Sequence, residues 1–285
     1  MIINVIKPYL CYSLILVVLT TISGCATVPT ANQRQNTLQQ LADEHGWQTN
    51  VIQTSQFDLM SAHISNMASS QRLTIYIEGD GLAWLTKNTL SNDPTPIVPI
   101  GLELAVIHDN GNVAYLARPC QYTGGLNARS CSTSLWSEGR FSESVVAAMS
   151  EAVDLLKQQY KATELRLIGF SGGGAVATLL AARRDDVTSL VTVAGNLDHV
   201  AWTAHHRISP LSDSLNPVDY VQSLNTVNQV HFVGSDDQVV PPLLAQQFIA
   251  QLPANSSTKL VIVDQQSHSC CWSQLWQRLL STHVD

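Results

Sequence analysis

Ser171 stands at the centre of the sequence Gly-Phe-Ser-Gly-Gly, residues 169–173. An apolar run, 165–168, comes directly before it and a run of small residues, 174–182, directly after it. This context predicts a strand, a tight turn and a helix. Such a turn needs glycines around the serine, because a Cβ there would collide with the neighbouring chain. It would hold the serine hydroxyl exposed above a sheet, where the hydroxyl could act as a nucleophile.

A serine hydroxyl becomes a good nucleophile only when a base takes its proton, and the base needs a third group to fix its tautomer. His268 is the predicted base, because it follows the last predicted strand and precedes the closing helix. The acid should follow an earlier strand, and Asp236 and Asp237 stand side by side just beyond the strand before the last one. Asp198, just beyond a still earlier predicted strand, is a further alternative.

Apolar runs and helical spacing of apolar residues alternate along the chain, which predicts an α/β fold with a mainly parallel sheet and helices on both faces. The predicted strands cover residues 47–53, 57–64, 73–77, 113–117, 165–170, 187–194, 227–233 and 260–263. The predicted helices cover residues 99–108, 141–160, 174–182, 242–252 and 272–280. Residues 195–226 form a connection far longer than such a unit requires, so we expect a lid there.

The order of these residues resembles the α/β-hydrolase superfamily over roughly residues 46–285. If 73–77 is the third strand, then Ser171 follows the fifth, Asp237 the seventh and His268 the eighth, as in that superfamily. The resemblance implies an α/β-hydrolase fold with a mostly parallel eight-stranded sheet and a lid insertion after strand six. Three segments also resemble a set of bacterial hydrolase-like lipoproteins: Ile-Glu-Gly-Asp-Gly at 77–81, Arg-Pro-Cys-Gln-Tyr at 118–122 and Ala-Gly-Asn-Leu-Asp at 194–198. The family spacing G-x-x-D-x-x-V-P, present at 234–241, favours Asp237 as the acid.

Negative charge that builds on a carbonyl oxygen needs backbone N–H donors. The first expected donor is Gly172, the residue after the serine. The second is Asp80, with Gly81 in reserve, because the loop Glu-Gly-Asp-Gly at 78–81 stands where relatives often have His-Gly-x. Carboxylates beside a forming oxyanion would oppose it, so we expect those of the loop to point away, with Arg118 as a partner.

Residues 1–24 have the pattern of a secretory signal, a basic start followed by a short apolar stretch. The sequence Ile-Ser-Gly-Cys that ends at Cys25 resembles the lipobox of bacterial lipoproteins, which implies that Cys25 is acylated. Residues 25–45 are then expected to be a membrane tether, and 46–285 the catalytic domain. Ala26 in place of aspartate implies retention at the outer membrane, facing the periplasm.

Four further cysteines, Cys120, Cys131, Cys270 and Cys271, would lie in an oxidising compartment. Three pairings are possible. The simplest joins Cys120 to Cys131 and leaves the other two either as a vicinal disulfide or as thiols.

The chain has 15 Lys and Arg against 22 Asp and Glu, and its formal net charge of −7 argues against a nucleic-acid partner. His199, His205 and His206 lie near Asp198, but their spacing matches no zinc pattern, and we expect neither a metal nor a cofactor.

These features predict a lipid-anchored serine hydrolase that cleaves an ester, thioester or similar acyl bond of a small-molecule or lipid-like substrate. An acyltransferase or a peptidase would use the same three residues. A hydrolase-fold scaffold of the cell envelope without activity is the alternative of a different class.

Overall fold

The computed structural model describes residues 28–64 and 70–285. The predicted strands are confirmed, with small shifts at their ends. They are β1 (Trp47–Gln53), β2 (Asp58–Ile64), β3 (Arg72–Ile77), β6 (Asn112–Leu116), β7 (Glu164–Phe170), β8 (Val187–Val193), β9 (Asn228–Gly234) and β10 (Thr258–Val263). They form one eight-stranded sheet in the order β1-β2-β6-β3-β7-β8-β9-β10.

Only β2 runs against its neighbours, since it pairs antiparallel with both β1 and β6. The pairs from β6 through β10 are all parallel. The carboxyl ends of these six strands therefore meet at one edge of the sheet, which is where ligands bind in open α/β sheets.

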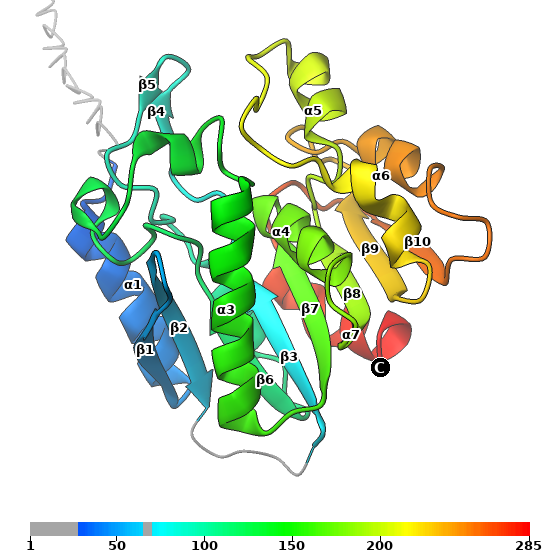
Figure 1. Ribbon diagram of the computed structural model, residues 1–285, viewed down its shortest axis with the longest axis horizontal. Coiled ribbons are helices and arrows are strands. Elements are labelled where there is room, and N and C mark those ends of the chain that lie inside the picture. Colours follow the sequence, from blue (N-terminus) through cyan, green and yellow to red (C-terminus); the bar gives the residue numbers. More distant parts are fainter. Residues whose placement is uncertain (1–27, 65–69) are drawn as a thin grey trace, which may run out of the picture.

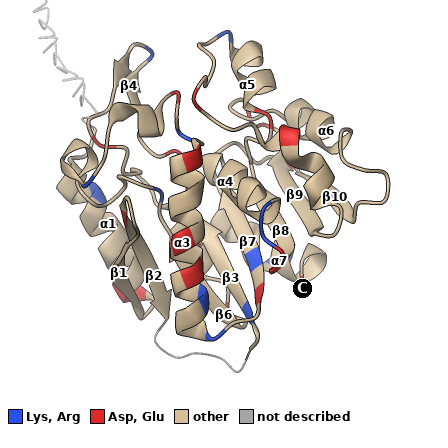
Figure 2. Ribbon diagram, viewed as in Figure 1, with Lys and Arg blue, Asp and Glu red and all other residues tan. Residues whose placement is uncertain are grey.

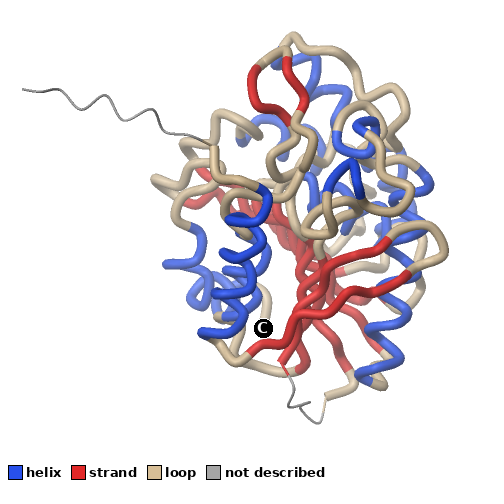
Figure 3. The backbone as a smooth tube through the Cα atoms, turned by 90° about the vertical axis from the view of Figure 1, so that its left-hand side faces the viewer, coloured by secondary structure: helices blue, strands red, loops and turns tan. Residues whose placement is uncertain are grey.

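Helices cover both faces of the sheet (Figures 1 and 3). They are α1 (Ala31–Glu44), α2 (Ile100–Val106), α3 (Glu143–Tyr160), α4 (Gly172–Ala181), α5 (His199–His206), α6 (Pro242–Ile249) and α7 (Trp272–His283). Apolar side chains of α1, α2 and α7 share one buried core, and those of α3, α4 and α6 share the other. Strand β7 serves both, because its side chains alternate between the two faces: Leu165 and Leu167 belong to one core, Ile168 and Phe170 to the other.

The prediction of a membrane tether over residues 25–45 is wrong for residues 31–44. Residues 31–44 form helix α1, which packs onto the sheet through Arg34, Leu38 and Ala42, all buried. These three side chains lie four residues apart and therefore share one helix face. The folded domain thus begins before residue 46.

A polar composition conceals this helix in the sequence. Its start is nevertheless marked by a capping box, in which the Thr30 hydroxyl accepts the Gln33 N–H and the Gln33 side chain accepts the Thr30 N–H. Arg34, on the buried face, forms an ion pair with Asp93 at 3.3 Å. One ion pair and two apolar side chains take the place of the apolar stripe that is typical of an amphipathic helix.

The hairpin of β4 (Trp84–Thr86) and β5 (Thr89–Leu90) was not predicted either. It lies in the connection that leaves the carboxyl end of β3 (Figure 1). The connection 195–226 contains α5 and a 3₁₀ segment, Pro217–Leu224.

The predicted signal, residues 1–24, and the lipidation site Cys25 lie outside the described residues. Among the residues that are described, none of the helices has the length and apolar character needed to cross a membrane. Figure 2 shows Lys and Arg dispersed among Asp and Glu along the chain rather than gathered on one element.

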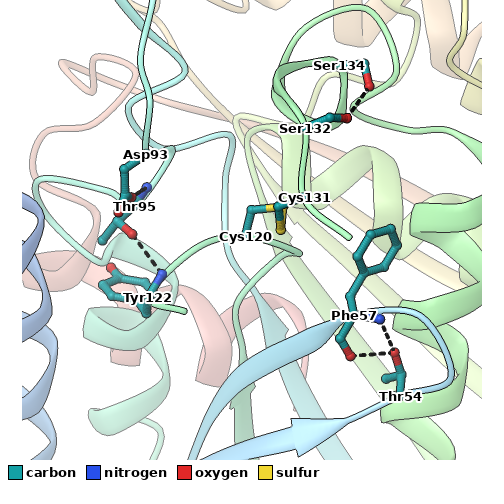
Figure 4. The surroundings of a disulfide bond; sticks show 9 residues. All are labelled: Thr54, Phe57, Asp93, Thr95, Cys120, Tyr122, Cys131, Ser132 and Ser134. Carbon is teal, nitrogen blue, oxygen red and sulfur yellow. Dashed lines mark hydrogen bonds between the residues drawn. A yellow bond between two sulfur atoms is a disulfide. The ribbon is translucent and has the colours of Figure 1, made fainter. Parts of the chain in front are cut away.

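The structure joins Cys120 to Cys131, whose Cα atoms lie 5.8 Å apart (Figure 4). This disulfide fastens the loop that leaves β6 close to the end of that strand. A second disulfide joins Cys270 to Cys271, the pairing that the sequence left open.

Candidate active site

Ser171 occupies the sharp turn between β7 and α4, with φ 51° and ψ −119°. A positive φ is uncommon for a residue other than glycine and marks a constrained turn. A Cβ on Gly169 would overlap the Gly173 carbonyl, and one on Gly173 would overlap the Ile77 carbonyl at the end of β3. The two glycines therefore let the turn close tightly, and the serine is held at the carboxyl edge of the sheet.

Three of the predicted site residues form one hydrogen-bonded chain. Ser171 Oγ lies 2.9 Å from His268 Nε2, and His268 Nδ1 lies 2.9 Å from Asp237 Oδ2. An ionised carboxylate can only accept, so Nδ1 carries the proton that it donates to Asp237. In the neutral ring, Nε2 is then the acceptor for the Ser171 hydroxyl. The arrangement can move a proton from the serine to the imidazole.

Both partners of the serine are themselves fixed. Asp237 is 1% exposed, and its Oδ1 accepts the backbone N–H groups of Val239 and Val240, each at 2.8 Å. The His268 carbonyl accepts a hydrogen bond from Trp272 Nε1 at 2.9 Å, which ties the histidine loop to α7. These supporting contacts depend on backbone atoms, so the sequence alone gives no sign of them.

The two alternative aspartates lie elsewhere. Asp198 caps α5, because its Oδ1 accepts the N–H groups of Val200 and Ala201 as well as Asn216 Nδ2. Asp236 accepts the Ser235 hydroxyl at 3.0 Å. The structure brings neither carboxylate to His268.

The three predicted oxyanion donors lie beside the serine turn or in the loop after β3. Gly172 is the first residue of α4, so its N–H has no partner within the helix. Within residues 28–64 and 70–285, the N–H groups of Asp80 and Gly81 also donate to no other group. Gly81 has φ +67°, and a Cβ there would overlap the Pro94 carbonyl. These N–H groups are available to a ligand oxygen.

The sequence predicts that the Asp80 carboxylate points away from the site. The structure contradicts this prediction. The carboxylate lies against Gly172, and Arg118 and Arg140 donate hydrogen bonds to its two oxygens. Burial opposes ionisation of this carboxyl, but the two guanidinium groups outweigh it and hold the pKa of Asp80 below its ordinary value. The sequence identified Arg118 as a partner; it gave no signal for Arg140, 60 residues beyond Asp80.

Glu78 is not a partner of Arg118 in hydrogen bonding. Its buried carboxyl accepts the N–H groups of Gly79 and Gly101 and the hydroxyl of Tyr115. Burial raises the pKa of Glu78 to about 7, although these three donors oppose the rise. The group therefore titrates near neutral pH, two residues before Asp80.

We expect the substitution Glu78→Gln to flatten part of the pH dependence of stability. Between the ordinary pKa of 4.5 and about 7, the folded state keeps a proton that the unfolded state releases, so the free energy of unfolding falls as pH rises. From about pH 5.5 to about pH 8.5, the wild type should lose about 2 kcal/mol more than the variant. Urea denaturation at the two pH values measures the difference. Parallel pH profiles for the two proteins would contradict the assigned titration.

The histidines of segment 195–226 make protein contacts. His199 Nε2 lies 3.3 Å from the Ser214 carbonyl, and His206 Nε2 lies 2.8 Å from the Val239 carbonyl. Trp202 Nε1 donates to the same Val239 carbonyl at 2.7 Å. Helix α5 is thereby bound to the loop that carries Asp237. No cluster of three or more metal-binding side chains occurs in the part of the chain that the structure describes.

Two cavities of about 400 Å³ lie away from the serine. One lies at the amino ends of the strands, where Arg72, Arg166 and Thr258 are among its lining residues, and the other lies beside α7. Neither contains a residue of the Ser171–His268–Asp237 chain.

A sheet of this strand order, with one antiparallel strand and a serine turn after the central strand, is the α/β-hydrolase fold. Solved structures confirm the match. The fold is similar to that of an esterase from Pyrococcus furiosus, with a TM-score of 0.59 and 15% identity over 85% of this chain and 90% of that one. It is also similar to an α/β serine hydrolase homologue from Coxiella burnetii, with a TM-score of 0.57 and 16% identity over 83% and 97%.

A third similar structure is an α/β serine hydrolase without a lid from Xanthomonas campestris, with a TM-score of 0.53 and 15% identity over 83% of this chain and 94% of that one. At these identities the likeness establishes the fold. No protein-family model matches the sequence, and the curated proteins contain no match.

Proposed function

We propose that this protein is a serine hydrolase that cleaves an ester, thioester or similar acyl bond. The observation that carries the proposal is the unbroken hydrogen-bonded chain from Ser171 through His268 to Asp237. A scaffold without activity would have no need to keep a buried carboxylate, an imidazole and a constrained serine in hydrogen-bonded order.

In this proposal Ser171 Oγ attacks the carbonyl carbon of the substrate while His268 Nε2 takes its proton. The oxyanion accepts the N–H of Gly172 and that of Asp80, with Gly81 in reserve. His268 then gives the proton to the leaving group, and the tetrahedral intermediate collapses to an acyl-enzyme. Water attacks the acyl-enzyme by the same route in reverse, and Asp237 stabilises the imidazolium that forms in each half-reaction.

We infer an apolar acyl group from the exposed side chains of the connections at the carboxyl edge of the sheet, the edge that also carries Ser171. Nine of the thirteen exposed large apolar side chains of the described residues lie in connections that leave the carboxyl ends of β3, β6, β8 and β9. Together they are called the apolar rim: Trp84, Leu85, Ile97, Val98, Leu126, Val200, Ile208, Val239 and Leu243. Exposed apolar side chains that gather on one side of a soluble domain are typical of a binding surface.

Segment 195–226 is the proposed lid, since it supplies Val200 and Ile208 to the apolar rim and its helix α5 bonds to the loop beyond Asp237. Acylation of Cys25 would hold the enzyme at the outer membrane, facing the periplasm. Lipid-like esters would then lie within reach of the site. A panel of p-nitrophenyl esters graded by acyl length measures the preference of the enzyme for long or short acyl groups.

Labelling with a fluorophosphonate probe tests the proposed function. The folded, oxidised wild type should be labelled, because the probe needs a serine that a neighbouring base activates. Ser171→Ala should not be labelled. Ser235→Ala should be labelled like the wild type, since the Ser235 hydroxyl donates to Asp236 and accepts the Gln265 N–H but bonds to none of the three residues Ser171, His268 and Asp237. If the folded wild type does not react, the protein is a scaffold and the proposal is wrong.

A further inference from the structure

Asp80 lies where three connections of the fold meet. Its carboxylate accepts Arg118 Nη1 from the end of β6 and, at 2.7 Å, Arg140 Nη1 from the segment before α3. A Cβ on Gly172 would overlap Asp80 Oδ1 and the Asp80 carboxyl carbon would lie 2.6 Å from it. The carboxylate is therefore packed directly onto the residue that follows the nucleophile.

The two arginines are fixed by contacts of their own. Arg118 and Arg140 are 4% and 6% exposed. Arg118 Nη2 donates to the Arg140 carbonyl, and its guanidinium lies 5.1 Å from the centre of the Phe141 ring. Arg140 Nε donates to the Ser137 carbonyl at 2.8 Å. Asp80 is thus held by a rigid pair rather than by mobile surface side chains.

The backbone around Asp80 is held from a different direction. Gln121 Nε2 donates to the Gly79 carbonyl at 2.8 Å, and Gln121 Oε1 accepts the Arg118 N–H at 3.0 Å. The Cys120–Cys131 disulfide lies beside this glutamine in the chain. Side-chain and backbone contacts together leave the Asp80 peptide little freedom to turn.

The charges of the group do not oppose an oxyanion. One carboxylate and two guanidinium groups carry a formal charge of +1 between them. Fixed charges and dipoles of this kind stabilise negative charge strongly in a site that excludes water, because they need no reorganisation during the reaction. An aspartate beside an oxyanion hole is therefore compatible with catalysis here.

We propose that Asp80 is a positioning residue for the oxyanion hole. Its side chain, held by Arg118 and Arg140, fixes the Asp80 N–H where it and the Gly172 N–H can donate to the same oxygen. The inference rests on the proposed serine hydrolase function. It assigns the Asp80 side chain a task that is separate from the donor role of the Asp80 backbone.

The test compares Asp80→Asn with Asp186→Asn. Asp186 is a matched control, since its carboxylate also bonds to two cations, Arg184 and Lys157, and its side chain is 19% exposed against 21% for Asp80. It precedes β8 and so lies at the opposite end of the sheet. Hydrolysis of p-nitrophenyl acetate and urea denaturation are measured for both.

We expect Asp80→Asn to lower kcat by about 10- to 100-fold, somewhat less than loss of a whole oxyanion donor, with KM within about 2-fold. Asp186→Asn should leave kcat unchanged even if it loses as much stability. A folded Asp80→Asn with wild-type kcat, or with a raised KM alone, would overturn the inference. So would an equal loss of kcat in both variants, because that would indicate general destabilisation.

If Asp80→Asn does not fold, Arg140→Lys replaces it, because lysine keeps the charge and one donor to Asp80 but not the contact with the Ser137 carbonyl. We expect a fall in kcat of about 10-fold at unchanged KM, and wild-type kcat would overturn the inference. Ser171→Ala, assayed in parallel, separates the two claims. If turnover persists in that variant, the proposed function itself is wrong; if turnover is lost there but unaffected in the Asp80 and Arg140 variants, only the positioning role is wrong.

Discussion

Replacement of Asp237 by asparagine should lower kcat by about 10⁴-fold while the protein remains folded. The backbone N–H groups of Val239 and Val240 both donate to Oδ1, so an asparagine would place its oxygen there and its NH₂ toward His268. The amide would then donate to Nδ1, and the neutral ring would carry its proton on Nε2. In that tautomer the imidazole cannot accept the proton of Ser171.

The other two aspartates provide the controls for this prediction. Asp236→Asn and Asp198→Asn should keep kcat within about 2-fold, since neither carboxylate contacts His268 and asparagine also caps helices well. Hydrolysis of p-nitrophenyl acetate measures all three variants. A loss in Asp198→Asn as large as that in Asp237→Asn would show that the acid has been assigned to the wrong strand.

Ser171→Ala and His268→Ala should each lower kcat by about 10⁶-fold, and the double variant should be no slower than either. The two side chains act in one step, because the histidine has nothing to deprotonate once the hydroxyl is gone. A residual rate of about 10³-fold over water should remain from the backbone donors and from substrate binding.

His206→Ala is the matched control for the loss of a histidine, since His206 contacts the Val239 carbonyl on the same loop as Asp237. It should change kcat by no more than a few-fold. Losses that multiplied in the Ser171 and His268 double variant would mean that the two residues act independently, and the proposed proton transfer would then be wrong.

The sequence was informative wherever a local pattern and the chain order pointed the same way. Alternating apolar runs located all eight strands of the sheet, and the residues just beyond three of them, Ser171, Asp237 and His268, converge at its carboxyl edge. In a parallel sheet those ends must meet, so chain order alone carried most of the geometry.

What the sequence concealed depends on contacts between distant residues. Arg140 lies 60 positions from Asp80, and nothing in its own neighbourhood marks it as a partner. Helix α1 is stabilised by a capping box, one ion pair and two apolar side chains, so the helical period is hardly visible. In both cases tertiary packing supplies what local composition lacks.

Helix α1 also limits how far the folded domain could lie from an anchor at Cys25. It begins at Ala31, so only six peptide units would separate an acylated cysteine from rigid structure. Even a fully extended chain of that length spans at most about 20 Å. An enzyme anchored in this way would reach only substrates in the lipid surface or in the thin layer of solvent beside it.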